Sequence, residues 1–190
     1  MAAKPGERKA QILQVLAEML EQPQQEKITT AALAARLEVS EAALYRHFAS
    51  KAQMFEGLIA FIEQTLFGLI NKISAEETDG RKQLEAILSL LLGFAQKNPG
   101  MTRVLIGDAL VNENERLQAR INQLHDRIEA TLRQCLRLAQ GGGDAERDTQ
   151  AEANVLLAFV VGRWHQFAKS GFKRAPLEHF EAQKTFLIPA

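Results

Sequence analysis

The segment VSEAALYRHFASK combines very small side chains with side chains that can bind phosphate and base edges. Ala42 and Ala43 stand just before Tyr45, Arg46 and His47. Alanines let a helix backbone approach another surface closely, while phenol, guanidinium and imidazole groups can all donate hydrogen bonds to phosphate oxygens. The combination favours a short helix that lies against nucleic acid. For each residue taken alone, a capped surface helix with a polar outer face is the alternative.

Two short helices joined by a brief turn are expected to position these side chains. Thr29 or Thr30 is suited to begin a helix through AALAARL, and Ser40 is suited to begin the next one. Leu44 would anchor the inner side of the second helix in a core. Helices of these lengths have the dimensions of a helix-turn-helix motif, in which the second helix enters the major groove of DNA.

The same stretch carries a resemblance to a known family. TTAALAARLEVSEAALYRHFASK (29–51) resembles the DNA-binding domain of the TetR family of helix-turn-helix proteins, whose motif reads T-x-x-x-[IL]-A-x-x-x-x-V-S-x-x-x-[LI]-Y-x-[HY]-F-x-[SNG]-K. The resemblance implies an all-α homodimer with an N-terminal three-helix domain that binds palindromic double-stranded DNA. The DNA-facing positions that it implies are Thr29, Thr30, Ser40, Ala42, Ala43, Tyr45, Arg46, His47 and Lys51.

Charge balance limits how such a domain can bind DNA. The chain has 23 Lys and Arg against 23 Asp and Glu, and residues 1–51 hold seven basic against six acidic residues. Binding therefore cannot rest on a large positive field and must rest on individually placed contacts. Lys4, Arg8 and Lys9 at the N-terminal end are expected to add to those contacts.

The rest of the chain is also expected to be helical. Ser50-x-x-Gln53 has the pattern of a capping box, and Asn98, followed by proline, is suited to cap a helix. With no strand pattern and no internal repeat, the fold class is all-α, with domains at 1–50 and 51–190. Apolar residues recur at helical spacing over 8–20, 51–73, 84–94, 113–139 and 151–169.

The last two of these helices, separated by a glycine-rich loop at 141–150, are expected to form a homodimer interface. The second is apolar almost all round, and two helices from each chain would make a four-helix bundle. The alternative is that both helices only form the core of the larger domain. The expected interface residues are Leu117, Ile121, Leu124, Ile128, Val155, Phe159 and Gly162.

Three further segments resemble the nucleoid occlusion factors of this family. They are LIAFIEQTL (58–66), LLLGFAQKNPGMTRVLIGDAL (90–110) and RLQARINQLHDRIEATLRQ (116–134). This resemblance implies a nucleoid-associated cytoplasmic protein that is activated by binding scattered chromosomal palindromes. The DNA-bound protein would block the assembly of FtsZ, and the number of dimers on each site is left open, higher-order assembly included.

The resemblance also implies a groove between the fourth and fifth helices that binds the C-terminal tail of FtsZ. Core packing would equally explain the apolar members of this set, and helix capping would explain the asparagine. Leu69 stands where relatives often carry a cation, which is a departure from the pattern. The groove positions are Phe61, Leu90, Gly93, Lys97 and Asn98.

Two other classes of function, a ligand-responsive repressor and an enzyme, would each need further features. A ligand-responsive repressor would need a cavity in the C-terminal domain, which Trp164, His125 and His165 could line. An enzyme would need a catalytic or metal-binding pattern, and the chain has no G-x-S-x-G, phosphate loop, H-E-x-x-H or paired His and Cys ligands. The sequence therefore predicts no catalytic residue, no metal site and no cofactor.

Membrane insertion and disulfide bonding are not expected either. The apolar runs at 88–95 and 155–162 are shorter than the roughly 20 residues that cross a bilayer, and the N-terminal residues lack the apolar stretch of a signal peptide. Cys135 is the single cysteine, so no disulfide can form within the chain. Its apolar neighbours predict a buried structural thiol.

Overall fold

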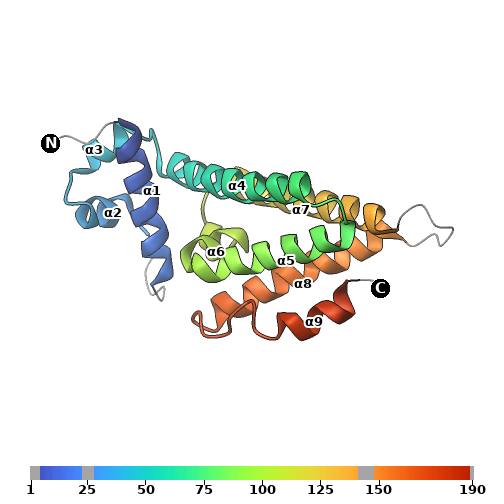
Figure 1. Cartoon of the computed structure of the whole chain (residues 1–190). Coiled ribbons are helices and arrows are strands. Elements are labelled where there is room, and N and C mark those ends of the chain that lie inside the picture. The colour runs from blue at the N-terminus through green and yellow to red at the C-terminus, as the bar shows by residue number, and fades with distance from the viewer. Residues whose placement is uncertain (1–4, 23–27, 141–147, 189–190) are drawn as a thin grey trace.

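The computed structural model describes residues 5–22, 28–140 and 148–188, and over these ranges it is helical without strands. The all-α prediction is confirmed, and Figure 1 shows the arrangement. The helices are α1 (Pro5–Glu21), α2 (Thr30–Arg36), α3 (Glu41–Tyr45), α4 (Lys51–Glu76), α5 (Gly80–Lys97), α6 (Pro99–Leu105), the 3₁₀ helix η1 (Asp108–Leu110), α7 (Glu115–Gln140), α8 (Thr149–Lys169) and α9 (Phe180–Leu187).

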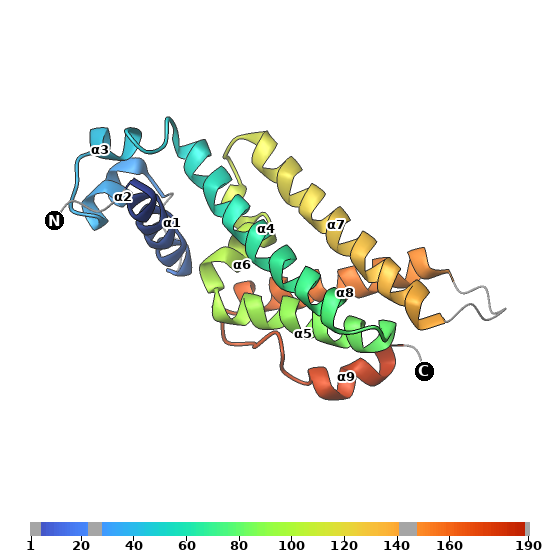
Figure 2. The ribbon, with the colours of Figure 1, turned by 45° about the horizontal axis from the view of Figure 1, so that its top comes forward.

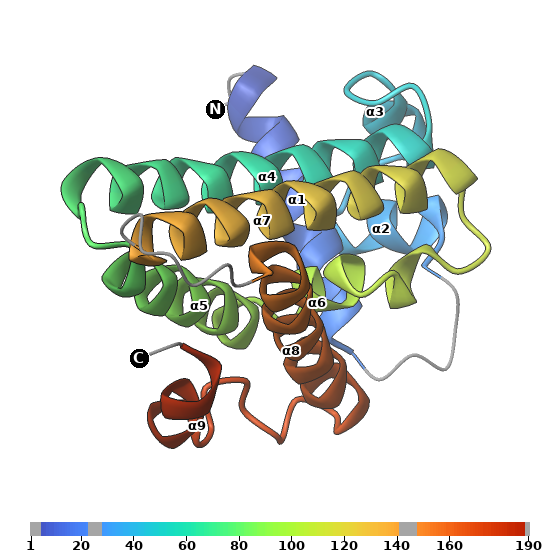
Figure 3. The ribbon, with the colours of Figure 1, turned by 90° about the vertical axis from the view of Figure 1, so that its right-hand side faces the viewer.

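Helices α1 to α3 form a small unit at one end of the molecule, and α4 runs from that unit into the larger helical domain (Figures 1 and 2). Figures 2 and 3 show α4 and α7 side by side. Helix α4 contacts α1 as well as α5 and α7, so it belongs to both parts of the molecule. The predicted domain boundary at residue 50 coincides with the start of α4 and stays a prediction.

Ion pairs join the first half of α4 to the first turns of α7. Glu56 accepts a bond from Arg116 at 2.7 Å. About two turns further along α4, Glu63 forms a two-bond pair with the guanidinium of Arg120, at 2.6 and 3.2 Å. Residue numbers rise together along both helices in these pairs, so α4 and α7 run parallel.

Helix α4 is, among the described residues, the one helix that is long and apolar enough to cross a membrane by length and composition. Its Leu58, Ile62 and Leu66 are completely buried in the protein core. The carboxylates of its Glu56 and Glu63 are bonded to α7. Both features are those of a helix inside a folded domain.

The apolar side of α7 is buried within the single chain, because α7 packs on both α5 and α8. This corrects part of the predicted dimer interface. Side chains that are fully enclosed in one chain cannot also meet a partner chain, so these four are core residues. They are Leu117, Ile121, Leu124 and Ile128, each 0% exposed.

The small unit is joined to the larger domain by a close contact between α1 and α6. A Cβ added to Gly100 would lie 1.9 Å from the carbonyl oxygen of Ala17, so only glycine permits this approach. One turn on, Arg103 donates to the carbonyl oxygens of Leu20 and Gln22 at 3.3 and 3.1 Å. These bonds satisfy acceptors that the end of α1 would otherwise leave open.

Two local predictions differ from the structure. Asn98 precedes α6 but makes no side-chain cap, because its amide donates to the carbonyl of Phe94 at 2.7 Å and closes the end of α5 instead. Helix α9 was not predicted, since its stretch FEAQKTFL gives only a weak apolar pattern. Most of the predicted loop at 141–150 lies outside the described residues, and Asp148 caps α8.

Candidate nucleic-acid interface

The helix-turn-helix is formed by local capping bonds, as predicted. The Thr29 hydroxyl accepts from the Ala32 N–H at 3.1 Å to begin α2. The Ser40 hydroxyl accepts from the Ala43 N–H at 3.3 Å to begin α3. Between the helices, Glu38 has a φ of 55° and turns the chain sharply. This turn sets the second helix across the first.

The inner side of α3 is anchored while its outer side is open to solvent. Leu44 and Phe48 are 1% and 8% exposed and belong to the core. Of the predicted DNA-facing residues, some are exposed and others half-buried, so the surface is accessible but its contact with DNA stays a prediction. The exposed ones are Thr29, Ser40, Ala42, Tyr45 and Arg46, and the half-buried ones are Thr30, Ala43, His47 and Lys51.

Hydrogen bonds hold Tyr45 across the two helices of the motif. Its hydroxyl donates to Thr30 Oγ1 at 3.4 Å, and the Thr30 hydroxyl donates to Glu41 Oε2 at 2.6 Å. Tyr45 is still 45% exposed. A phenol oriented in this way loses little rotamer freedom when it meets a phosphate. No local sequence pattern indicates this series of bonds, because Thr30 and Glu41 are on different helices.

Lys51 begins α4, directly after the motif. The capping box is formed around it: Ser50 Oγ accepts from the Gln53 N–H at 3.2 Å, and Gln53 Oε1 accepts from the Ala49 N–H at 2.8 Å. The ammonium of Lys51 is bonded to Glu113 in the C-terminal domain. Sequence reasoning missed Glu113, since no local pattern pairs two residues so far apart in the chain.

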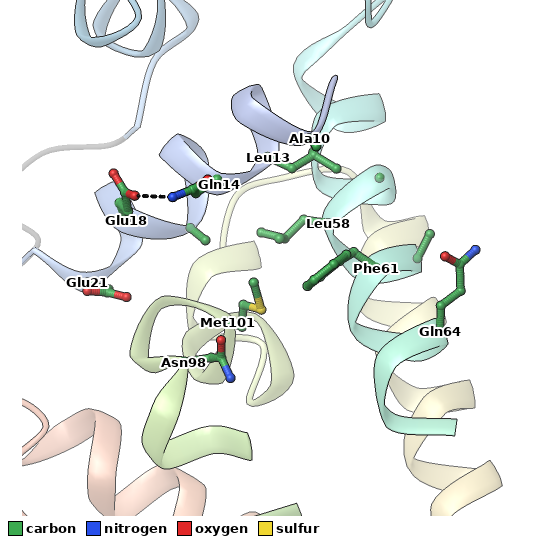
Figure 4. A pocket seen from close by; sticks show the side chains of 13 residues that line it. Ala10, Leu13, Gln14, Glu18, Glu21, Leu58, Phe61, Gln64, Asn98 and Met101 are labelled. Atoms are coloured by element: carbon green, nitrogen blue, oxygen red, sulfur yellow. Dashed lines mark hydrogen bonds between the residues drawn. The ribbon is translucent and has the colours of Figure 1, made fainter. Parts of the chain in front are cut away.

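A pocket of about 540 Å³ lies between α1 and α4, with α6 at its base (Figure 4). Leu13, Leu58 and Met101 give it an apolar lining, and Glu18 and Glu21 are on its α1 side. Two predicted groove residues, Phe61 and Asn98, line it as well. The pocket thus combines residues of the small unit with residues of the larger domain.

The other predicted groove residues lie along α5 and do not line this pocket. Leu90 is half-buried and packs against the core, while Lys97 is exposed. Gly93 is half-buried, and a Cβ there would lie 3.7 Å from the side chain of Leu177. Leu69 on α4 is 43% exposed. The structure therefore brings Phe61 and Asn98 together, and the remainder of the groove stays a prediction.

Helix α8 has an outward side that is small and apolar. Val155 is 60% exposed, Phe159 is half-buried and Gly162 is exposed with open space around its Cα. Three of the seven predicted interface residues are therefore accessible to a second copy of the chain. The absence of a side chain at Gly162 leaves room for close approach by another helix.

The residues considered for a ligand cavity do not share one. Trp164 is fully buried, with its indole N–H donating to the Leu91 carbonyl at 3.0 Å. His125 packs beside it with ring centroids 6.0 Å apart, and burial lowers the pKa of His125. His165 is exposed. Packing and exposure account for Trp164 and His165, whereas the Nε2 atom of His125 is buried without a hydrogen-bond partner.

Cys135 is a structural thiol, as predicted. It is 1% exposed, its thiol lies 3.3 Å from Gln83 Oε1, and burial raises its pKa to about 11. It is therefore protonated near neutral pH. Over the described ranges of the chain, no three His, Cys, Asp or Glu side chains gather in a way that could hold a metal ion.

A helix-turn-helix unit followed by a larger helical domain defines a TetR-type regulator. Residues 12–58 match the model for bacterial regulatory proteins of the tetR family, and residues 78–189 match the SlmA-like, tetracyclin repressor-like C-terminal domain. Among solved structures, a TetR transcription regulator from Haloarcula marismortui aligns with a TM-score of 0.80 at 17% identity, covering 96% of this chain and 97% of that one. At that identity the likeness shows the fold alone.

Curated relatives are much more similar. Nucleoid occlusion factor SlmA of Alteromonas mediterranea is 53% identical over 184 residues, covering 96% of this chain and 94% of its own. The protein of the same name from Shewanella pealeana is 54% identical over 191 residues, covering 98% and 96%. The chain therefore belongs to the TetR family and, within it, to the SlmA nucleoid occlusion factors.

Proposed function

We propose that the protein acts as a nucleoid occlusion factor in the cytoplasm, bound to the nucleoid. As a homodimer it binds palindromic double-stranded DNA, and in that state it inhibits FtsZ ring assembly over the chromosome. The observation that carries this proposal is the identity above 50% to nucleoid occlusion factors over nearly the whole chain. The accessible helix-turn-helix supports the DNA-binding half.

DNA recognition is assigned to α3 and to the residues that flank it. Ala42 and Ala43 allow the backbone of α3 to approach base edges, and Arg46 can reach a guanine or a phosphate. Tyr45, placed at the surface by its bond to Thr30, exchanges that bond for one to a phosphate and thereby fixes the docking angle. In a dimer the two α3 helices read the two halves of a palindrome, because protein and site share a two-fold axis.

Dimerisation is assigned to the outward side of α8. Val155 and Gly162 are both exposed in the single chain, which leaves an apolar strip with no cover of its own. A second copy of the same helix would cover this strip across a two-fold axis. With Leu117 and its three neighbours in the core, the contribution of α7 must come from its outward residues.

FtsZ binding is assigned to the surface where α4 and α5 meet, near the start of α6. Phe61 is 47% exposed, so its ring is available to a partner although Leu58 and Ile62 on the same helix are fully buried. Lys97 is an exposed cation at the end of α5 and can pair with an acidic peptide. With Leu69 replacing a cation, Lys97 carries more of that charge recognition.

Two experiments test the proposal in sequence. A chromosome-wide occupancy map in the protein's own cells should show many scattered sites that are scarce around the replication terminus. A duplex from one such site should then make the purified protein inhibit FtsZ assembly, measured by light scattering. One or two sites beside a transporter or enzyme operon would instead indicate a ligand-responsive repressor and refute nucleoid occlusion.

A further inference from the structure

The ammonium of Lys51 is bonded to a carboxylate of the C-terminal domain, although its position beside α3 suits it to bind phosphate. Lys51 Nζ lies 2.5 Å from Glu113 Oε1, and the two side chains are only 21% and 11% exposed. A carboxylate this close to a phosphate-binding position repels the phosphate and competes for the same cation. We propose that Glu113 restrains DNA binding by holding Lys51, so that DNA must take the ammonium from it.

Both partners of this pair are fixed before they meet. Lys51 is the first residue of α4, behind the Ser50 cap, and its ammonium also lies 5.7 Å from the centre of the Phe55 ring. The Glu113 N–H donates to the Leu110 carbonyl at 2.9 Å, in the turn that precedes α7. Many surface ion pairs contribute little because ordering two long side chains costs entropy. Here burial and local bonds reduce that cost.

The pair is also the first of a series between α4 and α7. Glu56–Arg116 and Glu63–Arg120 follow it along the two parallel helices. When Lys51 turns to a phosphate, Glu113, in the turn before α7, loses its cation. DNA binding thereby changes the charge distribution at this part of the C-terminal domain. By thermodynamic linkage, a partner that binds better when Glu113 is released from Lys51 strengthens DNA binding by the same factor.

This inference rests on the proposed phosphate contact of Lys51, and the test separates the two. Glu113→Gln keeps the side-chain shape and removes the charge. Binding to a fluorescein-labelled duplex from an occupied chromosomal site is measured by anisotropy. With two ion pairs released in each dimer, the variant should bind roughly 2- to 30-fold more tightly than the parent. Glu56→Gln is the matched control, since it breaks a neighbouring α4–α7 pair without freeing Lys51, and its affinity should be unchanged.

A second background distinguishes release of Lys51 from general charge removal. In a Lys51→Met protein, Glu113→Gln should give a clearly smaller gain, because only the repulsion between the carboxylate and phosphate is relieved and there is no ammonium to release. An equal gain in both backgrounds, or no gain in either, overturns the inference. If Lys51→Met leaves DNA affinity unchanged even in a protein that also carries Glu113→Gln, Lys51 does not contact phosphate. The inference is then refuted together with that contact. Thermal unfolding and light scattering confirm that each variant is folded and dimeric.

Discussion

Arg103 Nη1 lies 3.3 Å from the carbonyl oxygen of Leu20, so a side chain of α6 caps the last turn of the first helix. The same guanidinium pairs with Asp108 at 3.2 Å, and Asp108 also binds Lys169 at the end of α8. The helix-turn-helix unit is thereby held to the larger domain by specific bonds as well as by apolar packing. The angle between the two parts is consequently defined, and this angle sets how two such units fit one palindrome.

The close approach of α1 to α6 gives the first prediction. Gly100→Ala should lower the free energy of unfolding by about 1–3 kcal/mol, the usual range for overpacking, because its Cβ would clash with the Ala17 carbonyl. Gly68→Ala is the control: nothing lies within 4 Å of that position, so it should be neutral or stabilising by about 0.5–1 kcal/mol. Denaturant unfolding measures both. Equal stabilities would contradict the tight contact.

The second prediction concerns Tyr45. Tyr45→Ala should lower affinity for the chromosomal palindrome by at least about ten-fold, since a positioned phosphate donor is lost from each half of the dimer. Its thermal stability should stay close to that of the parent because the ring is 45% exposed. Lys72→Ala, at the far end of α4, should bind DNA normally. Unchanged affinity in Tyr45→Ala would refute the assignment of α3 as the recognition helix.

The salt dependence of DNA binding gives the third prediction. If about six phosphates are contacted by each dimer, the logarithm of the binding constant should fall with the logarithm of salt with a slope near −5. Anisotropy titrations between low and physiological salt measure this slope. A slope near zero would exclude phosphate contacts and with them the DNA-binding assignment.

The outward side of α8 gives the fourth prediction. Val155→Glu should shift the protein from dimer to monomer in analytical ultracentrifugation, because a charge would be buried without a partner. Val111→Glu is a matched change at a position that is 66% exposed beside η1, and it should leave the dimer intact. A dimeric Val155→Glu protein would move the interface elsewhere.

The last prediction separates the two activities of the protein. Lys97→Glu should leave DNA affinity unchanged and abolish the inhibition of FtsZ assembly, since it reverses the exposed charge at the end of α5, next to Asn98. Lys82→Glu makes the same change at the other end of α5 and should keep full inhibition. Should Lys97→Glu still inhibit FtsZ completely, the tail binds at another surface.

The helix-turn-helix could be predicted from the sequence because its determinants are local. Thr29 and Ser40 each bond to a backbone N–H three residues ahead, so composition and spacing already specify both helix starts. The buried state of Cys135 was predictable for a similar reason, since its apolar neighbours recur at helical spacing. The all-α class followed from the same periodicity repeated along the chain.

Other features depended on tertiary structure, because residues far apart compete for the same partner. Asn98 could cap α6 or close α5, and only the fold selects the Phe94 carbonyl. The periodicity of the sequence shows that the side of α7 that begins with Leu117 is apolar. It does not show whether that side packs against helices of the same chain or of a second chain. The pairing of Lys51 with Glu113 joins two parts of the chain that no local pattern connects. Sequence alone therefore determined the main helices and the helix-turn-helix to which DNA reading is assigned, because their signals are local. Long-range packing decided which apolar faces remain free and which charges are already bound.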